Sequence, residues 1–80
     1  MQRALQLVVE AARKGEQDFT AIEAQTAQYL TQLGWIVDYI SIRSALTLLS
    51  AEKTERQLVV LAAAKLGKTR LIDNLEFSLD

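Results

Sequence analysis

The sequence predicts an α+β fold: two N-terminal helices packed on a small three-stranded antiparallel sheet, with a short helical turn between the first and second strands. Two observations predict it. Apolar residues recur with a helical period as far as Gly34, after which the chain becomes rich in β-branched and aromatic residues. A Gly-Lys pair then separates the last two apolar runs, as in a hairpin turn. With 80 residues the chain is long enough for one domain, and we expect residues 1–80 to form it.

The first helix is expected over residues 1–14, where Ala, Leu, Glu, Gln, Arg and Lys dominate. One apolar stripe with the spacing i, i+3, i+4 and i+7 consists of Leu5, Val8, Val9 and Ala12. Gly15 can adopt the left-handed conformation that ends a helix. No capping residue precedes the first turn, which is the pattern expected of a chain that begins within a longer protein.

The second helix is expected to end at Gly34 and has two candidate N-caps, Asp18 and Thr20. Thr20 together with Glu23 matches the capping box. The buried side of this helix is expected to carry Phe19, Ile22, Thr26, Tyr29, Leu30 and Leu33.

Strands are expected over residues 35–42, 58–64 and 69–74, the last with a possible extension through Phe77. In the first strand, alternation predicts Ile36, Ile40 and Ile42 on one face and Trp35, Val37 and Tyr39 on the other. Trp35 and Tyr39 are interpreted as a seat for a helix, with the stacking of a nucleobase as the alternative.

The first and second strands are joined by two short segments. Residues 44–49 are expected to form the helical turn, capped by Ser44 and anchored by Ala45, Leu48 and Leu49. A polar loop is expected over residues 50–57.

Composition excludes several classes of function. The net charge of −1 argues against nucleic-acid binding through a broad basic surface. The absence of Cys and His removes thiolate nucleophiles, the commonest general base and the commonest metal ligand. The longest apolar run, Leu58–Ala64, is far shorter than the roughly 20 residues of a membrane span. Since no signal peptide is recognisable, we expect a cytoplasmic protein.

Gly67-Lys68-Thr69 matches the end of a phosphate-binding loop, but Ala62 occupies the position of the first glycine of that motif. A strand is also expected after Thr69, where the motif requires a helix. We therefore interpret Gly67 and Lys68 as the central residues of a hairpin turn, with nucleotide binding as the alternative.

Four polar residues in or near the strands are candidates for a structural or a binding role: Asp38, Arg70, Asp73 and Asn74. Asp38 is expected to cap a loop or to pair with a basic side chain. Arg70 and Asp73 are expected to pair, with Asn74 bonding to loop backbone, and an anion contact through the Arg70 guanidinium is the alternative. A miniature enzyme would require Asp38, Lys68, Arg70 and Asp73 to converge in a cleft.

The segment Leu61–Asn74, which ends in Arg70-Leu71-Ile72-Asp73-Asn74, resembles the closing segment of pantothenate synthetases (pantoate–β-alanine ligases). Val37-Asp38-Tyr39 is similar to the Asp-Tyr strand of that family, and residues 45–48 are similar to the turn that follows it. Ser44 departs from the family, which often has Asp there. The paired helices are similar in length and order, so the resemblance extends over essentially the whole chain.

The resemblance implies a parent enzyme that joins pantoate to β-alanine with ATP and Mg²⁺, through a pantoyl-adenylate. The family's N-terminal nucleotide-binding domain, with its His-x-Gly-His motif, has no counterpart in this sequence. The chain would then be the C-terminal domain, a lid over the active site that is inactive alone and holds no cofactor. Gly67 and the residues Asp38, Arg70, Asp73 and Asn74 are the lid candidates. No catalytic or metal-binding residue is assigned.

The same resemblance implies that the N-terminal synthetase domain is the main partner, that the parent is a homodimer, and that neither nucleic acid nor a membrane is bound. The alternative is a stand-alone interaction module that offers an open sheet face or an edge strand to another protein.

Overall fold

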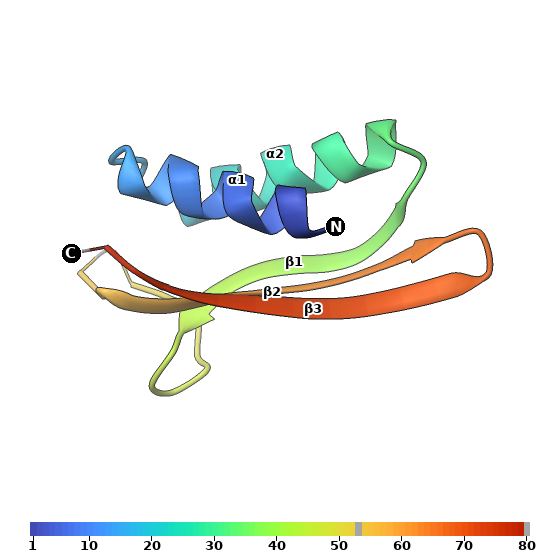
Figure 1. Ribbon diagram of the computed structural model, residues 1–80. Helices are drawn as coiled ribbons and strands as arrows, with labels where there is room; N and C mark the ends of the chain where they lie inside the picture. The colour runs from blue at the N-terminus through green and yellow to red at the C-terminus, as the bar shows by residue number, and fades with distance from the viewer. Residues whose placement is uncertain (53, 80) are drawn as a thin grey trace.

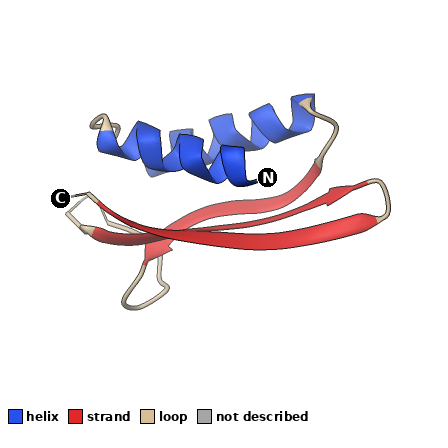
Figure 2. Ribbon diagram, viewed as in Figure 1, coloured by secondary structure: helices blue, strands red, loops and turns tan. Residues whose placement is uncertain are grey.

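The two helices lie on one face of the sheet, and the opposite face carries no helix (Figures 1 and 2). The computed structural model describes residues 1–52 and 54–79. Its elements are α1 (Gln2–Arg13), α2 (Phe19–Gln32), β1 (Ile36–Ser44), β2 (Gln57–Leu66) and β3 (Thr69–Ser78). The strands are antiparallel in the order β1-β2-β3, so β2 is central. This confirms the predicted α+β fold.

Helix α1 buries the predicted stripe. Leu5, Val8, Val9 and Ala12 are all buried, and Ala4 joins them because it lies one turn before Val8 on the same face. The N-cap residue is Met1, whose side chain makes no capping hydrogen bond. The helix is therefore stabilised mainly by packing against the sheet and α2 rather than by its N-terminus.

Helix α2 starts from Asp18, whose Oδ1 accepts a hydrogen bond from the Ala21 amide at 3.1 Å. The predicted capping box of Thr20 and Glu23 is wrong, because Glu23 lies in the second turn of the helix and bonds to the sheet instead. Of the six residues expected on the buried side, Ile22, Thr26 and Leu30 are buried.

Leu33 was expected to be buried with them but is exposed. It occupies the C-cap of α2, where the backbone is already leaving the helix for Gly34 at a φ of +96°. The helical period that places Leu30 toward the core therefore no longer applies to Leu33.

Strand β1 contains a β-bulge at Asp38. Val37 pairs with Ala64 and Tyr39 with the adjacent Ala63, so Asp38 has no partner of its own in β2. The extra residue reverses the alternation of side chains. Before the bulge, Trp35 and Val37 pack against the core, whereas after it Ile40 and Ile42 do so.

The predicted division of β1 into two faces was consequently wrong, because each predicted group includes one residue that lies on the opposite face from the other two. Ile36 was placed with Ile40 and Ile42, yet it is 66% exposed. Tyr39 was placed beside Trp35 but is exposed, while Trp35 is part of the helix-covered side. The two aromatic rings therefore do not share a face. Trp35 is confirmed as core-packing, and the paired stacking surface is not formed.

The central strand β2 is buried over most of its length. Leu58, Val60 and Ala62 belong to the core beneath the helices. Val59 and Ala63 alternate with them and are also buried, although they point to the opposite face. Strand β3 closes the core with Phe77, so its predicted extension through that residue is confirmed.

The segment after β1 makes one turn, which is capped by Ser44 as predicted. The Ser44 Oγ accepts hydrogen bonds from the amides of Leu46 and Thr47, and the Leu48 amide donates to the Ser44 carbonyl at 2.9 Å. The expectation that Leu48 and Leu49 anchor this turn is wrong, since both are exposed.

A loop follows the turn as expected, but β2 begins at Gln57, one residue earlier than predicted; Lys53 lies outside the described residues. In the described part of the chain, neither helix is long and apolar enough to cross a membrane.

Candidate functional site

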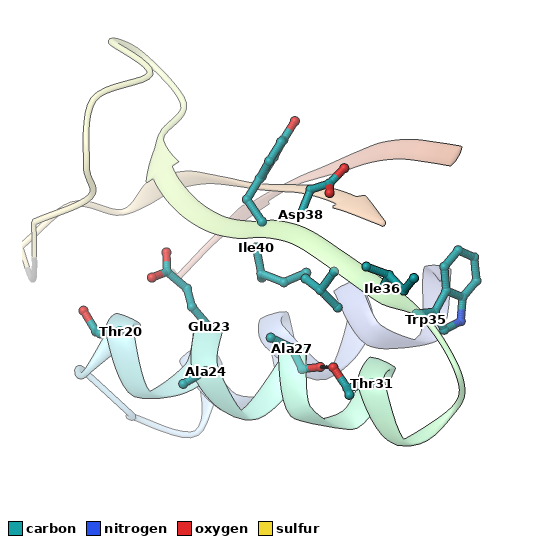
Figure 3. A pocket seen from close by; sticks show the side chains of 11 residues that line it. Thr20, Glu23, Ala24, Ala27, Thr31, Trp35, Ile36, Asp38 and Ile40 are labelled. Carbon is teal, nitrogen blue, oxygen red and sulfur yellow. Dashed lines mark hydrogen bonds between the residues drawn. The ribbon is translucent and has the colours of Figure 1, made fainter. Parts of the chain in front are cut away.

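An open cleft of about 630 Å³ runs between α2 and β1. Figure 3 shows it from close by, with Ile40 and Glu23 directed into the space between the helix and the strand. Its floor is made largely of small or apolar side chains from α2 and β1, among them Ala24, Ala27 and Ile40. The Thr31 hydroxyl is already used, because it donates to the Ala27 carbonyl at 2.8 Å. The cleft is therefore mostly apolar.

Glu23 is the acidic side chain directed into this cleft (Figure 3). Its Oε2 accepts a hydrogen bond from the Ile42 amide at 2.6 Å. Because β1 is an edge strand, this amide has no strand partner on that side, and the carboxylate takes the place of one. The arrangement joins α2 to the edge of the sheet and leaves Glu23 already engaged in a structural bond.

Asp38 and Arg70 form an ion pair, with 3.0 Å between Arg70 Nε and Asp38 Oδ2. The bulge points Asp38 away from the cleft, as Figure 3 shows, and toward the sheet face that carries no helix. The pair thus connects β1 to β3 across the central strand. The prediction that Asp38 pairs with a basic side chain is confirmed, but both side chains are roughly half-exposed, which is typical of a surface ion pair.

Asp73 does not pair with Arg70 as expected. Asp73 pairs in register with Ala62 and so lies on the helix-covered face, whereas Arg70 pairs with Lys65 and lies on the other. The Asp73 Oδ1 accepts from the backbone amide of Asn74 at 2.8 Å. Asn74 is in the middle of β3 rather than at a strand end, because the strand continues to Ser78. The three residues therefore do not form one cluster.

Gly67 and Lys68 form the two-residue hairpin turn that the sequence predicts, between the paired residues Leu66 and Thr69. Gly67 has a φ of +60°, and a positive φ at the first central position is what a type II′ turn requires. Strand β3 follows at once, so the helix that a phosphate-binding loop needs at its end is not formed here. The nucleotide-binding interpretation of this motif was wrong.

The four residues that a miniature enzyme would require are not brought together. Asp38 and Arg70 are paired, Lys68 is at the hairpin tip and Asp73 is on the opposite face, so the four residues do not converge. Among residues 1–52 and 54–79 there is no group of three or more acidic side chains that could hold a metal ion.

Two features were missed in the sequence. Glu23 was assigned to a cap because its spacing from Thr20 fits that motif, and its true partner lies 19 residues away. The second is the apolar loop after β1, in which Leu46 is 82% exposed. The signal for it was three leucines within four residues that match neither a helical stripe nor a strand alternation.

Comparison with known proteins finds one family and relatives that share one name. The family model described as pantoate-beta-alanine ligase matches residues 1–76. The chain is 64% identical over 77 residues to the pantothenate synthetase of Methylobacillus flagellatus, covering 96% of this chain and 28% of that relative. It is 51% identical over 77 residues to the pantothenate synthetase of Neisseria meningitidis serogroup C, with the same coverage.

The pantothenate synthetase of Pseudomonas entomophila is 46% identical over 78 residues, which are 98% of this chain and 27% of that relative. The chain therefore spans little more than a quarter of the length of the curated relatives it matches. Since the family model covers nearly all of it, the chain belongs to the pantoate–β-alanine ligase family.

Proposed function

We propose that this chain is the lid segment of an ATP-dependent pantoate–β-alanine ligase. The observation that carries the proposal is the match of the ligase family model to residues 1–76. In the proposed reaction, the pantoate carboxylate attacks the α-phosphate of ATP and releases pyrophosphate. The β-alanine amine then attacks the resulting pantoyl-adenylate, so that pantothenate and AMP leave.

We assign no part of an ATP or Mg²⁺ site to the described residues. The Gly-Lys-Thr motif is a hairpin turn, and the described residues include no acidic group of three that suits a divalent cation. We therefore assign the nucleotide, the cation and the two substrates to the remainder of the parent protein, which the proposal places in the cytoplasm as a homodimer. The contribution of this chain is to cover the adenylate and exclude water from it.

Inactivity of the chain alone is tested with pantoate, β-alanine, ATP and Mg²⁺. We expect no pantothenate above background from the 80-residue chain and clear turnover from the full-length parent. Turnover by the short chain would contradict its assignment as a lid. A parent that forms no pantothenate from these substrates would contradict the ligase assignment.

The lid role is tested by the fate of the adenylate. An intact ligase should release one AMP for each pantothenate, whereas a parent without residues 1–80 should release excess AMP, because water reaches the adenylate. Adding the 80-residue chain in trans should bring the ratio back toward one. An unchanged ratio in a truncated parent that remains folded and still forms the adenylate would contradict the role.

A further inference from the structure

The sheet face opposite the helices, here called the outer face, can be traced from the strand register. Tyr39 pairs with Ala63 and Ala63 with Ile72, so these three residues form one row across the sheet. Leu61 is at the centre of the next row, between Ser41 and Asn74. In the first row a small residue stands between two large apolar ones. Ile72 is 67% exposed, and no helix covers this face (Figure 1).

The turn after β1 projects on the same side of the sheet as the outer face, as the yellow-green loop in Figure 1 shows. We call residues 45–49 the leucine loop. Its three leucines, Leu46, Leu48 and Leu49, are 82%, 55% and 68% exposed. Isolated exposed leucines are common on protein surfaces, but three in one short loop form an exposed apolar cluster, which is typical of an interaction site.

The leucine loop is held in one conformation by hydrogen bonds. The Arg43 guanidinium donates to the Leu48 carbonyl at 2.9 Å, and the Ser44 amide donates to the Leu49 carbonyl at 2.9 Å. Leu48 has a φ of +63°, a left-handed conformation that is costly for a leucine. A bulky residue held in that conformation by surrounding bonds is frequent at binding surfaces, where rigidity lowers the entropic cost of association.

We propose that the leucine loop and the outer face dock against the rest of the ligase chain, with Leu46 and Leu49 as the anchoring side chains. The proposal rests on the proposed function, because it takes this chain to be part of a longer ligase. The length of the relatives indicates what covers this surface. Nearly three quarters of each pantothenate synthetase matched here lies outside the shared segment. A two-layer unit inside such a chain has one bare sheet face for the remainder to cover.

The test uses the full-length parent and amide hydrogen exchange at residues 46–49. Two docking variants are made, Leu46→Asp and Leu49→Asp. The matched control is Leu33→Asp, an exposed leucine at the end of α2 in the helical layer. We expect each docking variant to speed exchange in the loop by about tenfold or more, because burying an aspartate at an apolar contact opposes docking. The control should leave loop exchange unchanged.

Measuring the activity of the parent separately distinguishes the two proposals. A parent that makes pantothenate but shows the same loop exchange in wild type, Leu46→Asp and Leu49→Asp overturns the docking and leaves the ligase assignment standing. If the loop is protected from exchange in a parent that makes no pantothenate, the docking stands and the ligase assignment is overturned. Protection that disappears on dilution of the wild type identifies a second copy of the chain as the occupant and overturns the proposal. A melting temperature near that of wild type verifies that each variant is folded.

Discussion

The Arg70 guanidinium meets the Asp38 carboxylate at 3.0 Å across the central strand, although the two residues are on strands that do not pair with each other. The β-bulge makes this possible, because it adds one residue to β1 and directs Asp38 to the outer face. The ion pair thus connects the two edge strands on the face that we propose as a docking surface.

Removing this ion pair should have a small effect on the stability of the chain. We expect a coupling energy of about 0.2–1 kcal/mol between Asp38→Ala and Arg70→Ala, decreasing as salt is added, because both side chains are roughly half-exposed. A double-mutant cycle by urea unfolding measures it. The Arg3–Glu10 pair, at 3.7 Å, is the comparison and should show a weaker coupling. A coupling above about 2 kcal/mol would show that the pair is more strongly desolvated than its exposure indicates.

We expect Glu23 to contribute to the stability of the fold through the hydrogen bond it accepts, and not to act in catalysis. Glu23→Ala leaves the Ile42 amide without its carboxylate partner, and we expect a loss of about 1–3 kcal/mol in the free energy of unfolding. Glu23→Gln retains an acceptor oxygen and should lose about half as much. Glu76→Ala, which removes an exposed carboxylate from β3, is the control and should be close to neutral. Equal losses in the Ala and Gln variants would indicate that charge, not hydrogen bonding, is what α2 supplies to the strand edge.

Gly67 should resist replacement because of its backbone conformation. An added Cβ would meet no atom within 4 Å, so Gly67→Ala involves no clash with neighbouring residues. At a φ of +60° the substitution should nevertheless cost about 1–2 kcal/mol. Lys68→Ala, at the adjacent turn position, is expected to be nearly neutral, and thermal unfolding compares the two. A neutral Gly67→Ala would mean that the turn relaxes to another type.

Leu58 and Leu46 provide a matched pair of leucines with opposite burial. Leu58 is fully buried beneath the helices, and Leu58→Ala should cost about 2–5 kcal/mol through the cavity it leaves. Leu46→Ala should change the stability of the isolated chain by no more than about 0.5 kcal/mol, because its side chain is already in solvent. Urea unfolding of both variants is the measurement. A large loss for Leu46→Ala in the isolated chain would argue against a loop that is free to dock elsewhere.

Local features of the fold were predictable from the sequence. The apolar stripe of α1 follows from its period, and the turn at Gly67 follows from a glycine between two apolar runs. The β-bulge was not predictable, because nothing in the residues around Asp38 distinguishes an inserted residue from a regular one. One inserted residue then reversed the expected face of Ile36.

The long-range hydrogen bonds and ion pairs of the candidate site were also not predictable from the sequence. The sequence is compatible both with Glu23 in a local capping box and with Glu23 accepting a hydrogen bond from a distant strand edge. Only tertiary packing decides between these two partners. Tertiary packing likewise decides that Arg70 pairs with Asp38 and not with Asp73. Residues three apart on a strand lie on opposite faces, so their closeness in sequence was misleading.

The packing of α1 against β3 has a consequence for biosynthesis. Phe77 completes the core that contains α1, and the Arg13 guanidinium donates to the Ser78 carbonyl at 3.3 Å. A ribosome releases the helix first and the closing strand last. The packing of α1 against β3 therefore cannot be completed until Phe77 emerges, after both helices and the first two strands have left the ribosome.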